Sequence, residues 1–264
     1  MISISSAQLD TWLALFIFPL SRILGLLATA PVFNNAALPV RMRLIAGLAI
    51  TMALAPALPP LPALPASSWL GLIVLGQQIL IGVLLGYALR ITFAAVDVAG
   101  ELIGLQMGLS FATFFDPTSG GQTPVITEFL GLLTALIFLA MNGHLVALTV
   151  LAESFTLLPI STTPIHAAAF STLVAWAATL FSTGVLLALP LITALLIANI
   201  ALGVLARIAQ QLNLFAVGFP VTLALGFLVL LLSLPYIGAA MDGLFARGFQ
   251  AMGTVMRAAG GGPL

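Results

Sequence analysis

The sequence contains no lysine and no cysteine, and charged residues make up only 5% of its 264 residues. A soluble domain carries about 25% charged residues, so this composition excludes an ordinary soluble protein. The absence of cysteine excludes disulfide frameworks, thiolate nucleophiles and cysteine-ligated metal sites. Seven arginines and seven acidic residues cancel to a net charge of zero, which leaves no basic patch for nucleic acid.

What the sequence does contain is mostly apolar: 62% of the residues are hydrophobic and the mean hydropathy is +1.26. A helix that crosses a bilayer needs about 20 mostly apolar residues. Six runs reach or approach this length, so we expect an all-α integral membrane protein built from helical hairpins. The expected helices are Thr11–Val32, Leu44–Leu58, Trp69–Leu89, Val125–Leu151, Ala167–Ile200 and Phe215–Tyr236.

Two of these runs do not fit a simple crossing of the bilayer. The run 44–58 is short for a full span. The run 167–200 is too long for one span unless Pro190 kinks it or the helix rises beyond the bilayer. Between the runs, a proline-rich stretch over residues 55–66 predicts a stiff, extended connector.

A polar stripe interrupts the apolar pattern in the middle of the chain. Arg90, Asp97 and Glu101 recur at intervals of seven and four residues, on one side of a helix. The two carboxylates lie one turn apart, which is unfavourable unless one is protonated or a cation lies close. They are either a proton-carrying pair or part of an intramembrane ion-pair network, and we favour the network. Arg22, inside the first run, similarly needs a partner or a wet cavity.

Small residues in the same region predict close helix packing. Gly100, Gly104 and Gly108 recur every four residues, which leaves a groove without side chains on one helix face. Gly82 and Gly86 repeat this spacing in the expected helix before. These glycines are therefore candidate contact points with other helices or other subunits.

An aromatic, glycine-containing segment follows the polar stripe. Phe111, Phe114 and Phe115 precede an Asp116-Pro117 pair and the flexible residues 119–121. Aromatic side chains on a movable loop can close a conduit to water and ions, because only weak contacts must break to open it. Alternatively, the segment is a re-entrant loop whose phenylalanines anchor in lipid. Composition leaves these two interpretations open.

The sequence carries no pattern of catalytic or metal-binding residues. His144 and His166 are far apart and lack cysteine or carboxylate neighbours at metal-ligand spacing, so both are interpreted as structural. Motifs of the type GxSxG, HExxH or GxxxxGK[ST] do not occur. We expect neither an enzyme nor a protein with a bound metal or cofactor.

Several segments resemble the FliR family, export-gate proteins of bacterial flagella. The closest similarity is in AGELIGLQMGLSFATFFDP, Ala99–Pro117, and it continues in LPVRMRLIAGLAI, Leu38–Ile50, and NLFAVGFPVTLALG, Asn213–Gly226. The chain departs from the family at residues 207–211, where RIAQQ stands in place of a frequent Arg-x-x-Pro-Gln.

The resemblance implies a core subunit of the flagellar type III secretion export gate, in the bacterial inner membrane and the flagellar basal body. Its implied partners are FliP, FliQ, FlhB and FlhA, membrane lipid, and the unfolded flagellar proteins that the hetero-oligomer exports. It also implies a single membrane domain over residues 1–264, with a FliP-like part at about 1–165 and a FliQ-like hairpin at about 166–264.

The family resemblance further makes the segment from Gln106 to Gln122 a plug in the conduit, with Gly108, Gly120 and Gly121 as hinges. The implied plug residues are Gln106, Met107, Gly108, Leu109, Ser110, Phe111, Phe114, Phe115, Asp116, Pro117, Gly120 and Gly121. Two alternatives remain: a proton-coupled small-solute carrier that uses Asp97, Glu101 or Glu153, and a membrane scaffold without a conduit.

Overall fold

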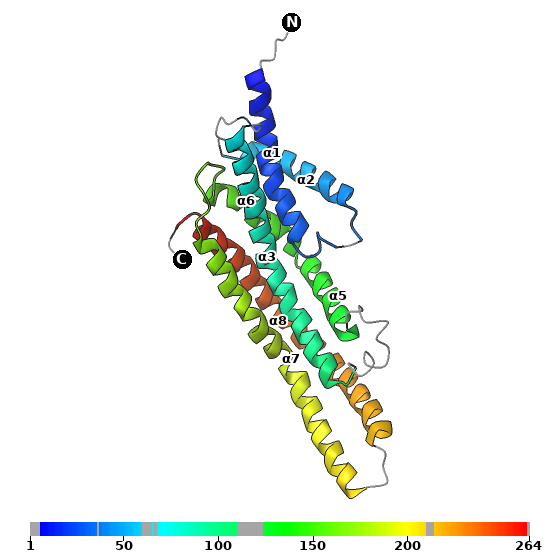
Figure 1. The fold of residues 1–264 in the computed structure, drawn as a ribbon. Coiled ribbons are helices and arrows are strands. Elements are labelled where there is room, and N and C mark those ends of the chain that lie inside the picture. The colour runs from blue at the N-terminus through cyan, green and yellow to red at the C-terminus, as the bar shows by residue number, and fades with distance from the viewer. Residues whose placement is uncertain are drawn as a thin grey trace. The chain divides into compact units, whose positions relative to one another are not determined.

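The computed structural model describes residues 6–35, 37–59, 65, 68–109, 124–209 and 214–262, without the side chains of residues 6–13 and 214–216. Within these ranges the regular structure is entirely helical, as the composition predicts for an all-α membrane protein. The helices in Figure 1 are α1 Ser6–Thr29, α2 Val40–Leu54, the short 3₁₀ helix η1 Ala55–Ala57, α3 Trp69–Gln106, α5 Val125–Ala140, α6 Gly143–Leu157, α7 Ala168–Ile208 and α8 Leu214–Ala259.

Four stretches of the described residues are long and apolar enough to cross a bilayer: 40–57, 69–106, 168–208 and 217–259. The pair α5 and α6 meets the same criterion only when it is taken together as one broken span. With 41 and 46 residues, α7 and α8 measure about 60 Å and 70 Å at 1.5 Å per residue. Both helices are therefore about twice as long as the roughly 30 Å hydrocarbon core of a bilayer.

Helix α3 continues through the point where the sequence predicts a boundary. The expected end at Leu89 is wrong, because α3 runs without a break to Gln106. Residues 90–106 are more polar than the segment before them, but they contain no proline or turn motif, so the hydropathy changes while the helix persists. The glycines 82, 86, 100 and 104 consequently lie on one helix instead of two.

The expected helix Val125–Leu151 is two helices, because the chain turns at Met141 and Asn142. Asn142 has φ +56°, the left-handed conformation that asparagine tolerates better than most residues. It precedes Gly143, and Asn-Gly is a strong turn signal that the apolar run on both sides conceals.

The prolines of the C-terminal half lie inside continuous helices. Pro190 lies within α7, and Pro220 and Pro235 lie within α8. The predicted end of the last helix at Tyr236 is wrong, since α8 continues to Ala259. Its last part alternates exposed charges with buried methionines, so it is an amphipathic helix that a search for uniformly apolar runs misses.

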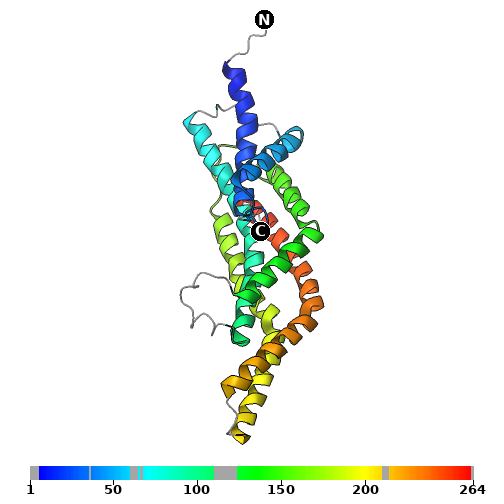
Figure 2. The same ribbon diagram turned by 90° about the vertical axis from the view of Figure 1, so that its right-hand side faces the viewer.

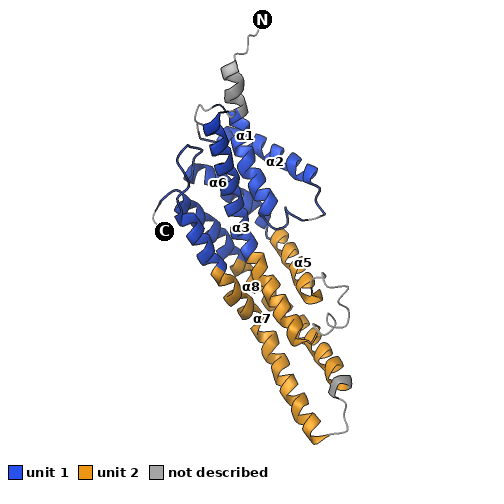
Figure 3. Ribbon diagram, in the orientation of Figure 1, with its two compact units in different colours: residues 1–91, 141–177, 245–264 blue, residues 92–140, 178–244 orange. Residues whose placement is uncertain are grey.

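Each of two compact units in Figure 3 is assembled from segments that are distant in the sequence. Unit 1 comprises residues 1–91, 141–177 and 245–264, and unit 2 comprises residues 92–140 and 178–244. The fully buried side chains of unit 1 include Phe18, Ile81, Leu85, Phe155 and Met252. Those of unit 2 include Ile103, Met107, Phe138, Leu195 and Met241.

Candidate functional site: the end of helix α3, the glycine contacts and a buried arginine

Helix α3 ends at the beginning of the predicted plug with a Schellman motif. Gly108 has φ +80°, a left-handed conformation that costs little only for glycine. The backbone N–H of Leu109 donates to the carbonyl oxygen of Gly104 at 3.0 Å, and that of Gly108 donates to Leu105 at 3.0 Å. These two bonds satisfy carbonyls that a helix end leaves without partners. Gly108, expected as a packing residue and a hinge, is thus the residue that ends α3.

Met107 anchors the end of α3 in the core of unit 2. Its side chain is fully buried and lies against Gly226 of α8. A Cβ atom at Gly226 would lie 2.7 Å from Cε and 2.8 Å from Cγ of Met107, so any larger residue there would require the methionine to shift. The sequence gives no signal for this contact apart from an isolated glycine inside an apolar helix.

The remainder of the predicted plug lies outside the described residues: Ser110, Phe111, Phe114, Phe115, Asp116, Pro117, Gly120 and Gly121. The described chain resumes at Pro124, and α5 begins at Val125. A Cβ atom at Gly100 of α3 would lie 2.6 Å from the Cα atom of Thr127, so the two helices that flank the segment touch near its ends. Tertiary contacts therefore fix the described helices on both sides of residues 110–123.

In unit 1, glycines bring α1 and α3 into backbone contact, and the two helices run side by side in both Figure 1 and Figure 2. A Cβ atom at Gly82 would overlap the carbonyl oxygen of Arg22, and one at Gly86 would overlap the hydroxyl of Thr29. On α1, a Cβ atom at Gly25 would lie 3.2 Å from the Cα atom of Gly82. Sequence spacing pointed to Gly82 and Gly86 but not to their partner Gly25.

The other glycine positions differ in how closely they are packed. A Cβ atom added at Gly104 would lie 4.0 Å from the Cβ atom of Ile126, which is an ordinary contact distance. Gly184 of α7 is much tighter, since an added Cβ would lie 2.7 Å from Val98 Cγ1. Gly184 follows no four-residue spacing, so sequence reasoning missed it.

Arg22 is fully buried, and all five of its N–H donors have acceptors. Its Nε and Nη2 donate to Gln78 Oε1 at 2.8 Å and 2.5 Å. Its Nη1 donates to the carbonyl oxygen and the hydroxyl of Ser154 at 2.8 Å and 3.1 Å, and Nη2 also donates to the carbonyl oxygen of Leu158 at 2.8 Å. The guanidinium thus joins α1, α3 and the end of α6.

The surroundings of Arg22 stabilise a cation without a carboxylate among its hydrogen-bond acceptors in the described residues. Its guanidinium carbon lies 4.2 Å from the ring centroid of Phe155, a cation–π contact. The carbonyls of Ser154 and Leu158 lie at the C-terminus of α6, where the helix dipole is negative. The sequence predicts that Arg22 needs a partner or a wet cavity, and neutral acceptors within unit 1 are its partners.

The other members of the predicted charge network lie at the surface of α3. The side chains of Arg90, Asp97 and Glu101 are exposed. A carboxylate oxygen of Asp97 lies 3.9 Å from the position of a Cβ atom at Gly131 of α5. Because the hydrogen bonds of Arg22 go to neutral groups, a network that links all four charged residues stays a prediction.

Among the described residues, no group of three or more histidine, cysteine, aspartate or glutamate side chains could hold a metal ion. The backbone N–H of His166 donates to the carbonyl oxygen of Ala259 at 3.0 Å and links the start of α7 to the end of α8. Its imidazole Nδ1 accepts from the Ala168 N–H at 3.4 Å. This histidine contributes to the local backbone structure of unit 1.

Comparison with known proteins places these features in a family. The family model of the bacterial export proteins, family 1, matches residues 13–248. The chain is 46% identical over 256 residues to the flagellar biosynthetic protein FliR of Pectobacterium carotovorum subsp. carotovorum, which covers 97% of this chain and 98% of the relative. It is 42% identical to FliR of Escherichia coli strain K12 over 97% of this chain and 98% of the relative. It is 33% identical to FliR of Aquifex aeolicus over 87% of this chain and 88% of the relative.

These matches cover nearly the whole chain, including the end of α3 and the glycine contacts. They support a role in flagellar export, and the long apolar helices make the chain a membrane-embedded flagellar protein. The chain belongs to the bacterial export proteins, family 1, as a member of the FliR family of flagellar biosynthetic proteins.

Proposed function

We propose that this chain is a core subunit of the flagellar type III secretion export gate in the bacterial inner membrane. It forms, with FliP and FliQ, the channel that passes unfolded flagellar proteins, and FlhB and FlhA are further partners of the assembly. It acts by shaping and closing a conduit and contributes no catalytic group.

The observation that carries this proposal is the combination of length and exposure in α7 and α8. Their candidate spans have mean hydropathies of 2.5 and 2.4, yet only 22% of each most apolar window is buried. Large apolar side chains are exposed along them, such as Phe181 at 68%, Ile197 at 64% and Leu232 at 73%. A bilayer covers about 30 Å of each helix, so apolar surfaces of other protein chains are needed for the remainder.

The plug assignment for residues 106–122 belongs to the same proposal. A conduit wide enough for an unfolded chain leaks ions when idle unless a displaceable apolar barrier closes it. The contacts of Met107 with Gly226 and of Gly100 with Thr127 support the assignment, because a plug must be held at its ends while its middle moves. Phe111, Phe114 and Phe115 supply the barrier.

The carboxylates that a proton-coupled carrier would use are Asp97, Glu101 and Glu153, and all three are exposed on helix surfaces. Carriers hold their coupling groups in an enclosed site near the middle of the membrane. Carboxylates on the surface of apolar helices instead suit contacts between subunits.

Native mass spectrometry tests the assembly. The tagged chain is extracted in mild detergent from cells that also express the neighbouring export genes. We expect one large hetero-oligomer that contains this chain with FliP-like and FliQ-like chains. A monomer or a small homo-oligomer would contradict the proposal and favour the carrier.

Membrane conductance tests the plug. Deleting residues 110–121, or replacing Phe111, Phe114 and Phe115 by serine, should raise ion leakage in cells that express the whole gate, because the apolar barrier is lost. Thr113→Ser with Thr118→Ser is the matched control and should leave leakage unchanged. Unchanged leakage in the deletion variant, in a particle of intact mass, would exclude the plug.

A further inference from the structure

Helix α2 is buried only on the side that faces α1, and its other sides are mostly apolar. Its buried positions are Gly47 and Thr51, and Gly47 packs against the side chain of Leu24 of α1. Five large apolar residues of the helix are exposed, with Val40 at 75%, Met42 at 54%, Leu44 at 45%, Ile45 at 58% and Met52 at 68%, and Leu48, Ile50 and Leu54 are half-buried. Only 11% of its candidate span is buried, the lowest share among the four spans found in the described residues.

The distribution of exposed residues on α2 distinguishes a partner helix from lipid as the material that contacts it. A helix that docks one partner helix presents an apolar stripe and keeps polar residues on the opposite face. The sequence VRMRLIAGLAITMAL instead offers no polar face beyond its first turn. With η1, α2 forms an apolar segment of 18 residues, about 27 Å long, close to the thickness of the hydrocarbon core. Lipid chains match a surface that is apolar over most of its circumference.

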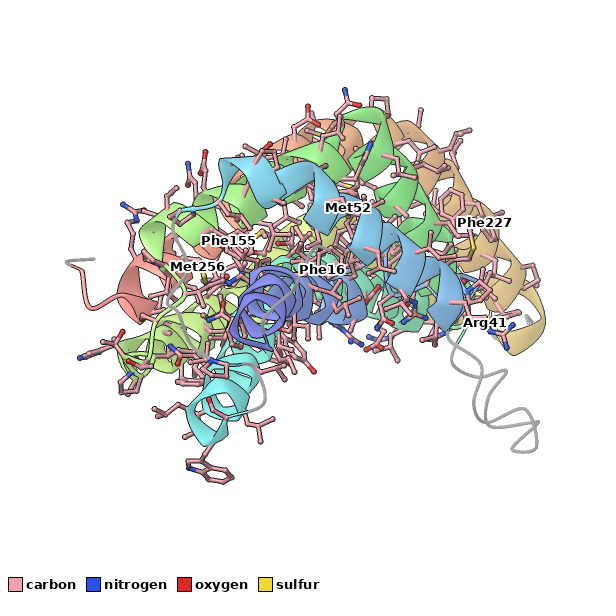
Figure 4. All side chains as sticks on the ribbon, turned by 90° about the horizontal axis from the view of Figure 1, so that it is seen from above. Phe16, Arg41, Met52, Phe155, Phe227 and Met256 are labelled. Carbon is pink, nitrogen blue, oxygen red and sulfur yellow. The ribbon has the colours of Figure 1, made fainter. Side chains whose placement is uncertain are left out.

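The two arginines in the first turn of α2 have different surroundings. Arg43 donates to Asn34 Oδ1 at 2.6 Å and to the carbonyl oxygens of Asn35 at 3.4 Å and Leu38 at 3.1 Å, so it holds the loop before α2. Arg41 is exposed. Figure 4 shows Arg41 at one end of α2, with Met52 farther along the helix. A cation at the end of an apolar helix is the arrangement that places a guanidinium at the level of lipid headgroups.

We propose that α2 is a lipid-facing helix whose apolar surface contacts phospholipid chains and whose Arg41 binds the headgroup of an anionic phospholipid. The seven arginines of the chain are its only basic side chains apart from two histidines, and Arg41 is the exposed arginine that begins the least buried span. The inference holds whether or not the export-gate proposal is correct, because it concerns the surface of α2 alone.

The first test measures what surrounds α2 in the complete particle in nanodiscs. The chain has no cysteine, so Met42→Cys, Ile45→Cys and Met52→Cys each introduce one labelling site in it for a nitroxide. The unsubstituted particle measures the nitroxide labelling of its other chains. A label at the exposed position of Thr162→Cys is the reference for a water-exposed site. We expect the α2 labels to collide with oxygen more than with a water-soluble nickel chelate. More collisions with nickel, or immobile labels that meet neither reagent, would overturn the proposal in favour of water or a protein partner.

The second test measures the choice of lipid. Particles are exchanged into mixed phosphatidylglycerol and phosphatidylcholine nanodiscs, released, and examined by native mass spectrometry for bound lipid. The electrostatic attraction between one arginine near the membrane surface and anionic lipid corresponds to about a five-fold change in lipid occupancy. We expect Arg41→Gln to lower retained phosphatidylglycerol about five-fold relative to phosphatidylcholine. Exposed Arg257→Gln changes the net charge equally and should have no effect. Equal retention in the Arg41 and Arg257 variants would overturn the headgroup assignment.

Discussion

Arg22 shows how a single buried cation can be accommodated in an apolar protein. A guanidinium has five donors, and an unsatisfied buried donor costs about 1–3 kcal/mol. Gln78, Ser154 and Leu158 provide acceptors for all five, and Phe155 adds its ring face. The residue therefore serves as a connector between helices that are distant in sequence.

Replacing Arg22 by methionine should destabilise unit 1. The substitution leaves Gln78 Oε1 as a buried acceptor without a donor, at about 1–3 kcal/mol. It also removes the hydrogen bond to the half-buried carbonyl of Leu158, at about 0.5–1.5 kcal/mol, for about 1.5–4.5 kcal/mol in total. Thermal unfolding of the purified particle in detergent measures the effect. Arg22→Lys should be intermediate, since it keeps the charge but loses the planar fork. Exposed Arg257→Met is the control, within about 0.5 kcal/mol of the parent protein. A midpoint for Arg22→Met equal to that of the control would contradict this role.

Replacing Gly108 should change the end of α3. At φ +80° an alanine costs about 1–2 kcal/mol, whereas asparagine tolerates this conformation better. We expect Gly108→Ala to weaken the Schellman hydrogen bonds and Gly108→Asn to weaken them less. Hydrogen exchange of the Leu109 amide measures this difference, and equal exchange rates in the two variants would count against the interpretation.

At the scale of elements, glycines decide which helices lie in backbone contact. Gly82 and Gly86 on α3 meet α1, and Gly100 farther along the same helix meets α5. The first part of α3 thus packs within unit 1, and residues 92–106 pack within unit 2. Four-residue spacing predicts that a glycine face exists, but the partner helix follows from the tertiary fold.

Two alanine substitutions on α3 should therefore differ in their effect on stability. A Cβ atom at Gly82 would overlap the backbone of Arg22, so Gly82→Ala should destabilise the protein by about 1–3 kcal/mol. Gly76 has nothing within 4 Å of an added Cβ, so Gly76→Ala should be neutral or stabilising by up to about 1 kcal/mol through helix propensity. Thermal unfolding of both variants is the measurement. Destabilisation by the same amount would show that α3 is sensitive to any added methyl group.

At the scale of the whole molecule, the net charge of zero conceals an uneven distribution. Unit 1 contains six arginines and two acidic residues, a net charge of +4, and unit 2 contains one arginine and five acidic residues, a net charge of −4. The two units of the chain therefore carry opposite net charges. This partition is invisible in the sequence, because each unit draws its residues from separate segments.

Assembly should depend on the exposed apolar side chains of α7 and α8. Leu232 is 73% exposed in the chain, so Leu232→Gln leaves the fold of the chain unchanged. Burying a leucine contributes about 1.5–3 kcal/mol, so we expect at least a ten-fold loss in the fraction of chain found in the large particle. Exposed Thr193→Gln on α7 is the control for the added amide. An unchanged particle yield for Leu232→Gln would place that residue outside the subunit contacts.

The sequence by itself determined the class of this protein and the location of its helices. Low charge, high hydropathy and apolar runs predict membrane helices, because the bilayer requires that composition of any segment that crosses it. The same reasoning failed at the ends of α3, α5 and α8. A hydropathy pattern follows apolar character, whereas Asn142, an unbroken polar segment and an amphipathic C-terminus control where helices end.

Only the tertiary structure decided which residues act together. The spacing of Gly82 and Gly86 was visible in the sequence, but their partner Gly25 and the isolated contacts at Gly184 and Gly226 were not. Arg22 likewise required a partner, and the fold supplied the amide of Gln78 and the carbonyls at the end of α6. The reason is physical: these contacts join residues that are far apart along the chain, so their geometry exists only after the helices have packed.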